Sequence, residues 1–511
     1  MTTVVIMVVI VLYLAMMIAI GAHFSKTNNT ADDFYLGGRK LGPLVTAMSA
    51  EASDMSSYLL MGLPGLAYIC GIADVGWTAI GLAIGTYVNW LVVSKRIRRY
   101  SHQIEAITIP DFFAKRYKDK NNILTCLAAL VIFVFFVPYT ASGFAACGKL
   151  FNSLFGANYM TAMIVCAIII VLYTTLGGFL AASTTDLIQS VVMTIALIIV
   201  VFYATVQAGG IDEVMANAKA LPGYFSMGMT HDAETNTGSV YGGLTIISTL
   251  AWGLGYFGMP HILLRFMATK EEEKLTLSRR IATVWVVISM TVAVMIGVVG
   301  RTMSANGKIE VLTGNNSETI LIKIADLLSS HGIFATVIAG IILSGILAAT
   351  MSTADSQLLA ASSAVSQNIL VDFLHIKLTS KQSVIIARCT VVVLSLIAMF
   401  LARDPNSSVF KIVSFAWAGF GAAFGPTMLL ALYWKRSNKW GALVGMFLGG
   451  LMVFIWKFAV RPMGGVLDIY ELLPAFIVGL LANVIVSLLT KAPDKAIIEE
   501  FEEMAQVSKT E

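Results

Sequence analysis

The sequence predicts an all-α polytopic membrane protein. Of its 511 residues, 57% are apolar and 13% are charged, whereas soluble proteins carry about 25% charged residues. The mean hydropathy is +0.81, and hydrophobic runs fill nearly the whole chain. These observations exclude a water-soluble fold and leave no room for a separate catalytic domain.

Thirteen segments are apolar and long enough to cross a bilayer, which takes about 20 residues. They cover residues 3–23, 41–70, 74–94, 123–151, 158–176, 181–208, 239–266, 281–300, 332–362, 383–402, 407–434, 441–460 and 472–489. Residues 209–238 are expected to form a polar loop, and residues 308–330 to contain a short amphipathic helix. We interpret residues 1–490 as one transmembrane domain and residues 491–511 as an acidic cytoplasmic tail that is frayed.

The basic residues predict the orientation. With thirteen spans, 24 of the 34 Lys and Arg residues fall on one face and nine on the other, while Arg388 lies within a span. Because basic loops stay on the cytoplasmic side, we expect a cell-membrane protein with its N-terminus outside and its C-terminus inside. The net charge of +4 gives no reason to expect nucleic acid as a partner. The bilayer is the expected surrounding, and no obligate protein partner is implied.

Two of the thirteen spans are interrupted by residues that an ordinary membrane helix avoids. The interruptions are residues 49–58, SAEASDMSSY, and residues 252–261, WGLGYFGMPH. They open two groups of five spans, residues 41–208 and 239–434, which we interpret as repeats. Unwound backbone is tolerated at mid-membrane only where it lines a cavity, and five spans per repeat require opposite orientations. The pattern predicts a transporter in which the first span and residues 441–490 are peripheral.

Enzymatic functions have little support in the sequence. No phosphate-binding loop, HExxH or G-x-S-x-G motif stands in its required structural context. A membrane sensor would need an attached signalling domain, and a passive channel would not need carboxylates beside two broken helices. We therefore expect a transporter and no enzyme.

Four carboxylates lie within the predicted spans: Glu51, Asp54, Asp186 and Asp355. Each costs about 2.5 to 3.5 kcal/mol when it is unpaired at the bilayer centre, so function or pairing must offset the cost. Asp186 alternatively lies at the membrane interface, and Asp355 alternatively accepts a hydrogen bond from a neighbouring serine. Glu51 either binds a ligand directly, or it acts as a gate or as the partner of another residue.

One face of span 332–362 carries oxygen ligands. Ala349, Ser352 and Thr353 are spaced i, i+3, i+4, so a small residue and two hydroxyls share this face. The broken span 41–70 offers carbonyls such as those of Ala52 and Met55. Hard cations prefer oxygen ligands, so together these groups could form a Na⁺ cage. The alternative is ordinary packing of small polar residues between helices.

At these motifs the sequence resembles the sodium/solute symporter family, most closely its bacterial sodium/proline symporters. The similar stretches are DFYLGGR (33–39), SDMS (53–56), LMGLPG (60–65), GGF (177–179), AWGLGYFG (251–258), PH (260–261), MST (351–353) and FAWAGFGAAFGP (415–426). The resemblance implies a LeuT-type five-plus-five inverted repeat. It also implies uptake of L-proline coupled to Na⁺ by alternating access, with Na⁺ as a coupling ion instead of a tightly bound cofactor.

The resemblance also implies roles for individual residues. The main Na⁺ site would use the carbonyls of Ala52, Met55 and Ala349 and the hydroxyls of Ser352 and Thr353. Asp54 matches a carboxylate that is associated with Na⁺ dependence. Asp186 matches a position where some relatives hold a further Na⁺. The residues around the substrate would be Ser56, Trp252, Tyr256, Pro260 and Tyr139, with Ser57 and Tyr58 adjoining.

The chain departs from the proline-symporter pattern in three places. It has Ser57-Tyr58 where that pattern has Gly-Trp, Glu51 where it has Gly, and Met259 where it often has Gln. Two of these departures adjoin the implied pocket. The alternative function is therefore Na⁺-coupled uptake of another small solute, such as a different amino acid, pantothenate or a monocarboxylate.

Overall fold

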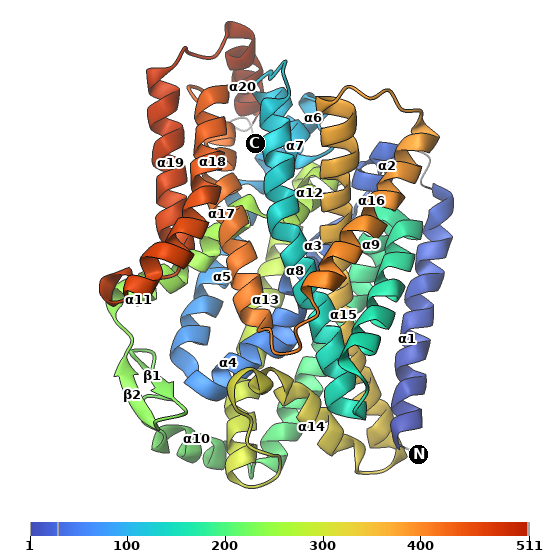
Figure 1. Ribbon diagram of the computed structural model, residues 1–511, viewed down its shortest axis with the longest axis vertical. Coiled ribbons are helices and arrows are strands. Elements are labelled where there is room, and N and C mark those ends of the chain that lie inside the picture. Colours follow the sequence, from blue (N-terminus) through green and yellow to red (C-terminus); the bar gives the residue numbers. More distant parts are fainter. Residues whose placement is uncertain (1, 28–29, 508–511) are drawn as a thin grey trace.

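The computed structural model describes residues 2–27 and 30–507, and it forms a bundle of long helices (Figure 1). Helix α1 (Thr2–Phe24) lies at one edge, and α18 (Lys439–Ile455) with α19 (Leu472–Leu489) lies at the opposite edge. Helix α1 begins at the end of the bundle opposite to α20 (Lys495–Val507). An odd number of crossings gives this arrangement.

The short helix α2 (Ala31–Leu36) precedes the first predicted repeat, which contains a broken pair, three long helices and their connections. The helices of the repeat are α3 (Pro43–Ser57), α4 (Leu63–Cys70), α5 (Ile72–Val92), α6 (Ser94–Gln103), α7 (Ile109–Arg116), α8 (Ile123–Phe155) and α9 (Tyr159–Gln207). Helix α9 has 49 residues and would measure about 74 Å if straight, whereas the hydrocarbon core is about 30 Å thick. Its backbone leaves the helical region at Gly178 (φ 63°, ψ −159°), between the two spans predicted there.

The second predicted repeat follows a small extramembrane segment. Its helices are α11 (Gly243–Leu250), α12 (Pro260–Ala268), α13 (Leu275–Ala305), α14 (Ile320–Ser329), α15 (Ile333–Ser363), α16 (Ser380–Leu401) and α17 (Val409–Tyr433). The short α14 confirms the helix expected within residues 308–330. Helix α15 lies at the centre, where it packs against α1, α3, α8 and α9.

The loop at residues 209–238 has more structure than the sequence predicts. It contains α10 (Ile211–Ala220) and an antiparallel hairpin of β1 (Met229–Asp232) and β2 (Thr237–Val240), in which Met229 pairs with Val240. The Asp232 carboxylate accepts the backbone N–H groups of Glu234 at 2.8 Å and Thr235 at 3.2 Å. These hydrogen bonds favour the charged form and lower the pKa of Asp232.

Within the described residues, ten helices are long and apolar enough to cross a membrane. The pair α11–α12, bent by 46°, makes an eleventh if it is one span. The predicted thirteen also count α9 as two spans and α3–α4 as one. The segment α3–α4 is not among the ten because its centre is polar. The count of thirteen stays a prediction.

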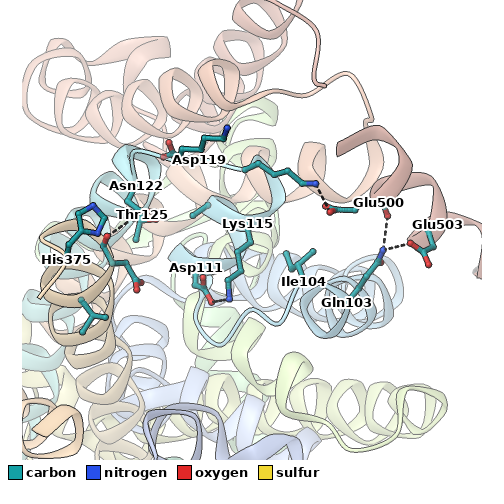
Figure 2. A pocket seen from close by; sticks show the side chains of 15 residues that line it. Gln103, Ile104, Asp111, Lys115, Asp119, Asn122, Thr125, His375, Glu500 and Glu503 are labelled. Carbon is teal, nitrogen blue, oxygen red and sulfur yellow. Dashed lines mark hydrogen bonds and ion pairs between the residues drawn. The ribbon is translucent and has the colours of Figure 1, made fainter. Parts of the chain in front are cut away.

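The C-terminal segment is ordered, and the expectation of a frayed tail is wrong for residues 495–507. Helix α20 buries Phe501 and Met504, and its acidic face pairs with basic side chains, as Glu500 does with Lys118 at 2.7 Å. A cavity of about 850 Å³ lies beside it, and Figure 2 shows Gln103 of α6 reaching Glu503 of α20. Apolar burial and ion pairs together explain why this segment docks. Residues 508–511 of the predicted tail lie outside the described residues.

Candidate functional site

Helix α3 is broken at the position that the sequence predicts. Ser56 has a backbone φ of 50° and ψ of −171°, a left-handed conformation that is strained for a residue with a Cβ atom. A π-helical turn, Tyr58–Gly62, follows before α4 begins. Carbonyls just before the break cannot all keep their helical N–H partners. The Asp54 carbonyl instead accepts the Tyr139 hydroxyl at 3.2 Å.

The second break joins α11 to α12 through the 3₁₀ segment Ala251–Gly258. Met259 is extended, and Pro260 opens α12. Gly255 is needed for close packing, because a Cβ atom added there would lie 1.9 Å from the indole nitrogen of Trp417. That nitrogen donates a 2.7 Å hydrogen bond to the Trp252 carbonyl. Helix α17 thus supports the broken segment directly.

The structure brings the predicted oxygen ligands of α3 and α15 together. The Ser352 hydroxyl donates to the carbonyls of Ala52 at 2.8 Å and Ala349 at 3.2 Å. Thr353 also donates to the Ala349 carbonyl, at 3.2 Å. The Met55 carbonyl accepts the backbone N–H of Tyr58. Buried hydroxyls and carbonyls therefore converge where α15 crosses the broken helix.

Aromatic residues form the other side of the break. Tyr256 donates its hydroxyl to Asp54 Oδ2 at 2.7 Å, and the ring of Tyr58 stacks on Trp252 at 5.6 Å. A small cavity is lined by Asp54, Met55, Tyr58, Leu82, Tyr139, Trp252, Met290, Val413 and Trp417. The volume open to the centre of a water molecule is only about 10 Å³. Admission of a solute the size of an amino acid therefore requires the aromatic rings to move.

The cavity does not include every residue expected near the substrate. Ser56, Ser57, Tyr256 and Pro260 are buried, but none of them lines this small space. The Ser56 hydroxyl accepts the Tyr58 backbone N–H at 3.1 Å. The structure places these residues beside the break without showing contact with the cavity.

Sequence reasoning missed three aromatic residues at this site. Trp417 lines the cavity, Tyr470 stacks on Trp252 at 5.0 Å between ring centroids, and Phe410 stacks on Tyr58 at 5.6 Å. Trp417 stands in a span rich in Gly and Ala, so an isolated indole there was a usable signal. Nothing local in the sequence marks Tyr470 or Phe410.

Asp186 belongs to a buried network instead of lying at an interface. It is 0% exposed and pairs with Arg265 of α12, 1% exposed, at 3.1 Å. It also accepts the Ser49 hydroxyl at 2.6 Å. The charge count from the sequence assigns Arg265 to the loop after residues 239–266, and the structure corrects this assignment. A buried guanidinium offsets much of the cost of the Asp186 charge.

Asp355 lies in the same network. Its carboxylate accepts hydrogen bonds from Tyr173 at 2.8 Å and from Ser356 at 3.0 Å. Arg265 donates to the same Ser356 hydroxyl at 2.5 Å. The serine contact that the sequence offers as an alternative for Asp355 is therefore present. The network holds two carboxylates and one guanidinium.

Glu318 and Lys149 form a second buried ion pair at the N-terminal end of α17. Their charged atoms are 2.8 Å apart, and the side chains are 5% and 9% exposed. Glu318 also accepts the Ser408 hydroxyl at 3.0 Å and the backbone N–H of Phe410 at 3.2 Å. A carboxylate at this position satisfies N–H groups that have no partner within the helix. The contact fixes the start of α17 and thus the ring of Phe410 over Tyr58.

Comparisons with known proteins agree with this architecture. The profile of the Sodium:solute symporter family matches residues 34–449. The chain is 42% identical to a sodium/proline symporter of Salmonella typhimurium over 96% of this chain and 94% of that one. It is 40% identical to the osmoregulated proline transporter OpuE of Bacillus subtilis over 98% of this chain and 97% of that one.

Solved structures give the same fold. A substrate-bound, outward-open Na⁺-coupled sialic acid symporter superposes with a TM-score of 0.79 at 18% identity, covering 96% of this chain and 99% of that one. A nucleobase-cation-symport-1 family transporter in a closed conformation gives a TM-score of 0.55 at 16% identity, covering 94% and 96%. The chain therefore has the LeuT-type fold of these transporters, and the family and the relatives named above are transporters. The chain belongs to the sodium:solute symporter family.

Proposed function

We propose that the chain imports L-proline together with Na⁺ across the cell membrane by alternating access. The relatives named as proline transporters cover nearly the whole chain at about 40% identity. The observation that carries the proposal is the Ser352 hydroxyl bound to the Ala52 carbonyl at 2.8 Å. Na⁺ coordinated there by Ala52, Met55, Ala349, Ser352 and Thr353 would tie α15 to the unwound part of α3.

Coupling follows from the position of that segment. The same few residues of α3 face α15 on one side, and Asp54 accepts the Tyr256 hydroxyl on the other. A cation that orders the break pre-organises the substrate pocket, and the substrate reciprocally raises the affinity for the cation. One charge crossing 100 mV supplies about 2.3 kcal/mol and a tenfold Na⁺ gradient adds about 1.4, so one Na⁺ sustains roughly several-hundred-fold accumulation.

The pocket residues have distinct roles in this proposal. Trp252, Tyr58 and Tyr139 line the small cavity and provide apolar surface for a pyrrolidine ring, with Tyr256 behind them. Ser56, Ser57 and Pro260 shape the backbone around the carboxylate and imino groups. The pocket opens only when the rings of Tyr58 and Trp252 separate. In alternating access it is open to one side of the membrane at a time.

We also propose Asp186 as part of a further Na⁺ site: its Oδ2 pairs with Arg265, whereas its Oδ1 is buried with no hydrogen-bond partner among the described residues.

We further propose that the N-terminus lies outside and the C-terminus inside. The orientation is supported by the 23 to nine split of basic residues that remains once Arg265 is placed in the buried core. It is also supported by the opposite ends at which α1 begins and α20 lies. The repeats would comprise residues 41–208 and 239–434. Span 1 and residues 441–490 lie at opposite edges of the bundle, as peripheral elements would.

A second candidate is Na⁺-coupled uptake of another small solute. One observation favours it: Tyr58 lines the cavity, at a position where the proline-symporter pattern has Trp. The test is uptake of radiolabelled L-proline into proteoliposomes under imposed Na⁺, Li⁺ or H⁺ gradients. We expect a Na⁺ gradient to drive uptake and unlabelled L-proline to outcompete alanine, glycine and pantothenate. Uptake blocked by another solute but not by excess proline would refute the substrate assignment.

A further inference from the structure

A groove lies where α13 packs against α9 and α3, away from the site described above. Its volume is about 540 Å³, within the range of small-molecule pockets. The polar groups along its wall already have partners. Trp285 donates its indole N–H to the Thr194 hydroxyl at 2.8 Å, and the Ser289 hydroxyl donates to the Val286 carbonyl at 3.2 Å. The groove therefore offers apolar surface to whatever occupies it.

The groove opens toward the bilayer. Val284 and Ile288 of α13 and Ile198 of α9 line it, and they are 59%, 51% and 53% exposed. Both helices are long and apolar enough to cross a membrane, so these exposed side chains face hydrocarbon. The occupant is therefore a lipid chain or the apolar surface of another protein.

The length of the groove matches one leaflet of the bilayer. Along α13 the lining runs from Arg280 to Val292, and this stretch of helix is about 18 Å long. Half of the hydrocarbon core measures about 15 Å. Since α13 begins at Leu275, Arg280 stands in its second turn, at the level of the headgroups. The groove thus runs from the headgroups to the middle of the bilayer, as one acyl chain does.

Arg280 gives the headgroup end of the groove a positive charge. Its side chain is exposed and pairs with no carboxylate in the described part of the chain. The neighbouring Arg279 turns to α5 instead, where its guanidinium lies 5.2 Å from the ring centroid of Tyr87. Guanidinium groups bind phosphate oxygens through paired hydrogen bonds. A second copy of the chain seated here would have to bury Arg280, which is costly without a partner.

We propose that this groove binds an anionic phospholipid, with the phosphate on Arg280 and one acyl chain between α9 and α13. Basic pockets between membrane helices hold anionic headgroups in this way. In the orientation proposed above, α13 begins on the cytoplasmic side, where anionic lipids give the leaflet its negative surface potential. None of the residues assigned to the cation cage or to the aromatic cavity lines this groove.

The bound chain would contact the broken helix. Met48 of α3 lines the groove and is 7% exposed, and the adjacent Ser49 donates to Asp186 at 2.6 Å. Ser56, where α3 breaks, follows Met48 by about two helical turns. Movement of this half of α3 would reshape the groove and change its affinity for the lipid, so lipid binding would shift the conformational equilibrium. This consequence rests on the proposed alternating access, whereas the site itself does not.

Thermal unfolding of the purified full-length chain in detergent tests the headgroup contact. Dioleoylphosphatidylglycerol or dioleoylphosphatidylcholine is added to the micelles, and a bound lipid raises the midpoint of unfolding. We expect the anionic lipid to give the larger shift and Arg280→Gln to weaken its apparent affinity roughly fivefold. Arg279→Gln is the matched control and should keep the wild-type affinity. Equal shifts from both lipids, or equal affinity in wild type and Arg280→Gln, overturns the site.

A brominated acyl chain tests the position of the tail, because bromine quenches indole fluorescence on contact. The chain has eight tryptophans, and the difference between the wild type and Trp285→Phe isolates Trp285. We expect saturable quenching by brominated phosphatidylglycerol that is smaller in Trp285→Phe. Identical quenching in both proteins overturns the placement of the tail. A dimer, detected by light scattering, that protects Trp285 from the brominated lipid would assign the groove to a second copy and overturn the proposal. Neither assay involves proline or Na⁺, so a failure of the proposed transport function would leave both results standing.

Discussion

Removing one hydroxyl from α15 tests the main cation site directly. Ser352 donates to the Ala52 carbonyl at 2.8 Å, so Ser352→Ala deletes an oxygen at the crossing of α15 and α3. A buried polar group left without its partner costs about 1 to 3 kcal/mol. Since 1.4 kcal/mol is a factor of ten, the Na⁺ concentration for half-maximal uptake should rise roughly 5- to 150-fold. Thr353→Ala should act in the same direction.

The measurement is Na⁺-dependent proline uptake in proteoliposomes at matched protein density. Ser344→Ala is the control, because the Ser344 hydroxyl is equally buried but donates only to the Gly340 carbonyl of its own helix, at 2.9 Å. It should leave the Na⁺ dependence at the wild-type value. If Ser352→Ala and Thr353→Ala both insert normally and keep wild-type Na⁺ dependence, the assignment of this cage is wrong.

The remaining predictions concern the aromatic wall, the specificity and the α17 anchor. Trp252→Ala should weaken proline affinity in a competition assay while surface expression holds, because the indole lines the cavity; lost expression with unchanged affinity would indicate packing instead. Ser57→Gly combined with Tyr58→Trp should change the preference among small amino acids by roughly ten- to two-hundred-fold and keep Na⁺ coupling, and a loss of coupling would contradict a purely steric role. Glu318→Ala should destabilise the protein by about 3 to 5 kcal/mol in thermal unfolding, because it leaves Lys149 buried without its carboxylate; the double variant with Lys149→Met should recover part of that loss, and no recovery would argue against the ion pair.

Much of the architecture could be predicted from local sequence. Residues 49–58 and 252–261 stand out because polar and helix-breaking residues are costly in lipid, and both breaks lie where they are expected. The i, i+3, i+4 spacing of Ala349, Ser352 and Thr353 fixes their common face once the segment is helical. The polar centre of α3 also explains why the span at residues 41–70 is less apolar than the ten long membrane helices.

The tail and the loop at residues 209–238 were harder to predict. Helix α20 is held by the burial of Phe501 and Met504 and by ion pairs to distant basic residues such as Lys118. The acidic composition of the segment suggests fraying, because the surface that it packs against is absent from the local sequence. Tertiary contacts decided this element.

The sequence by itself determined which segments enter the membrane and which residues are costly there, because hydropathy and the energy of an intramembrane charge are properties of each segment alone. Only the tertiary structure decided which groups compensate those costs. Asp54 meets Tyr256 across 202 residues of chain, and Asp186 meets Arg265 across 79. Helices in a bilayer associate through shape and polar contacts instead of a hydrophobic pattern. Such partners therefore emerge only when the helices are packed together.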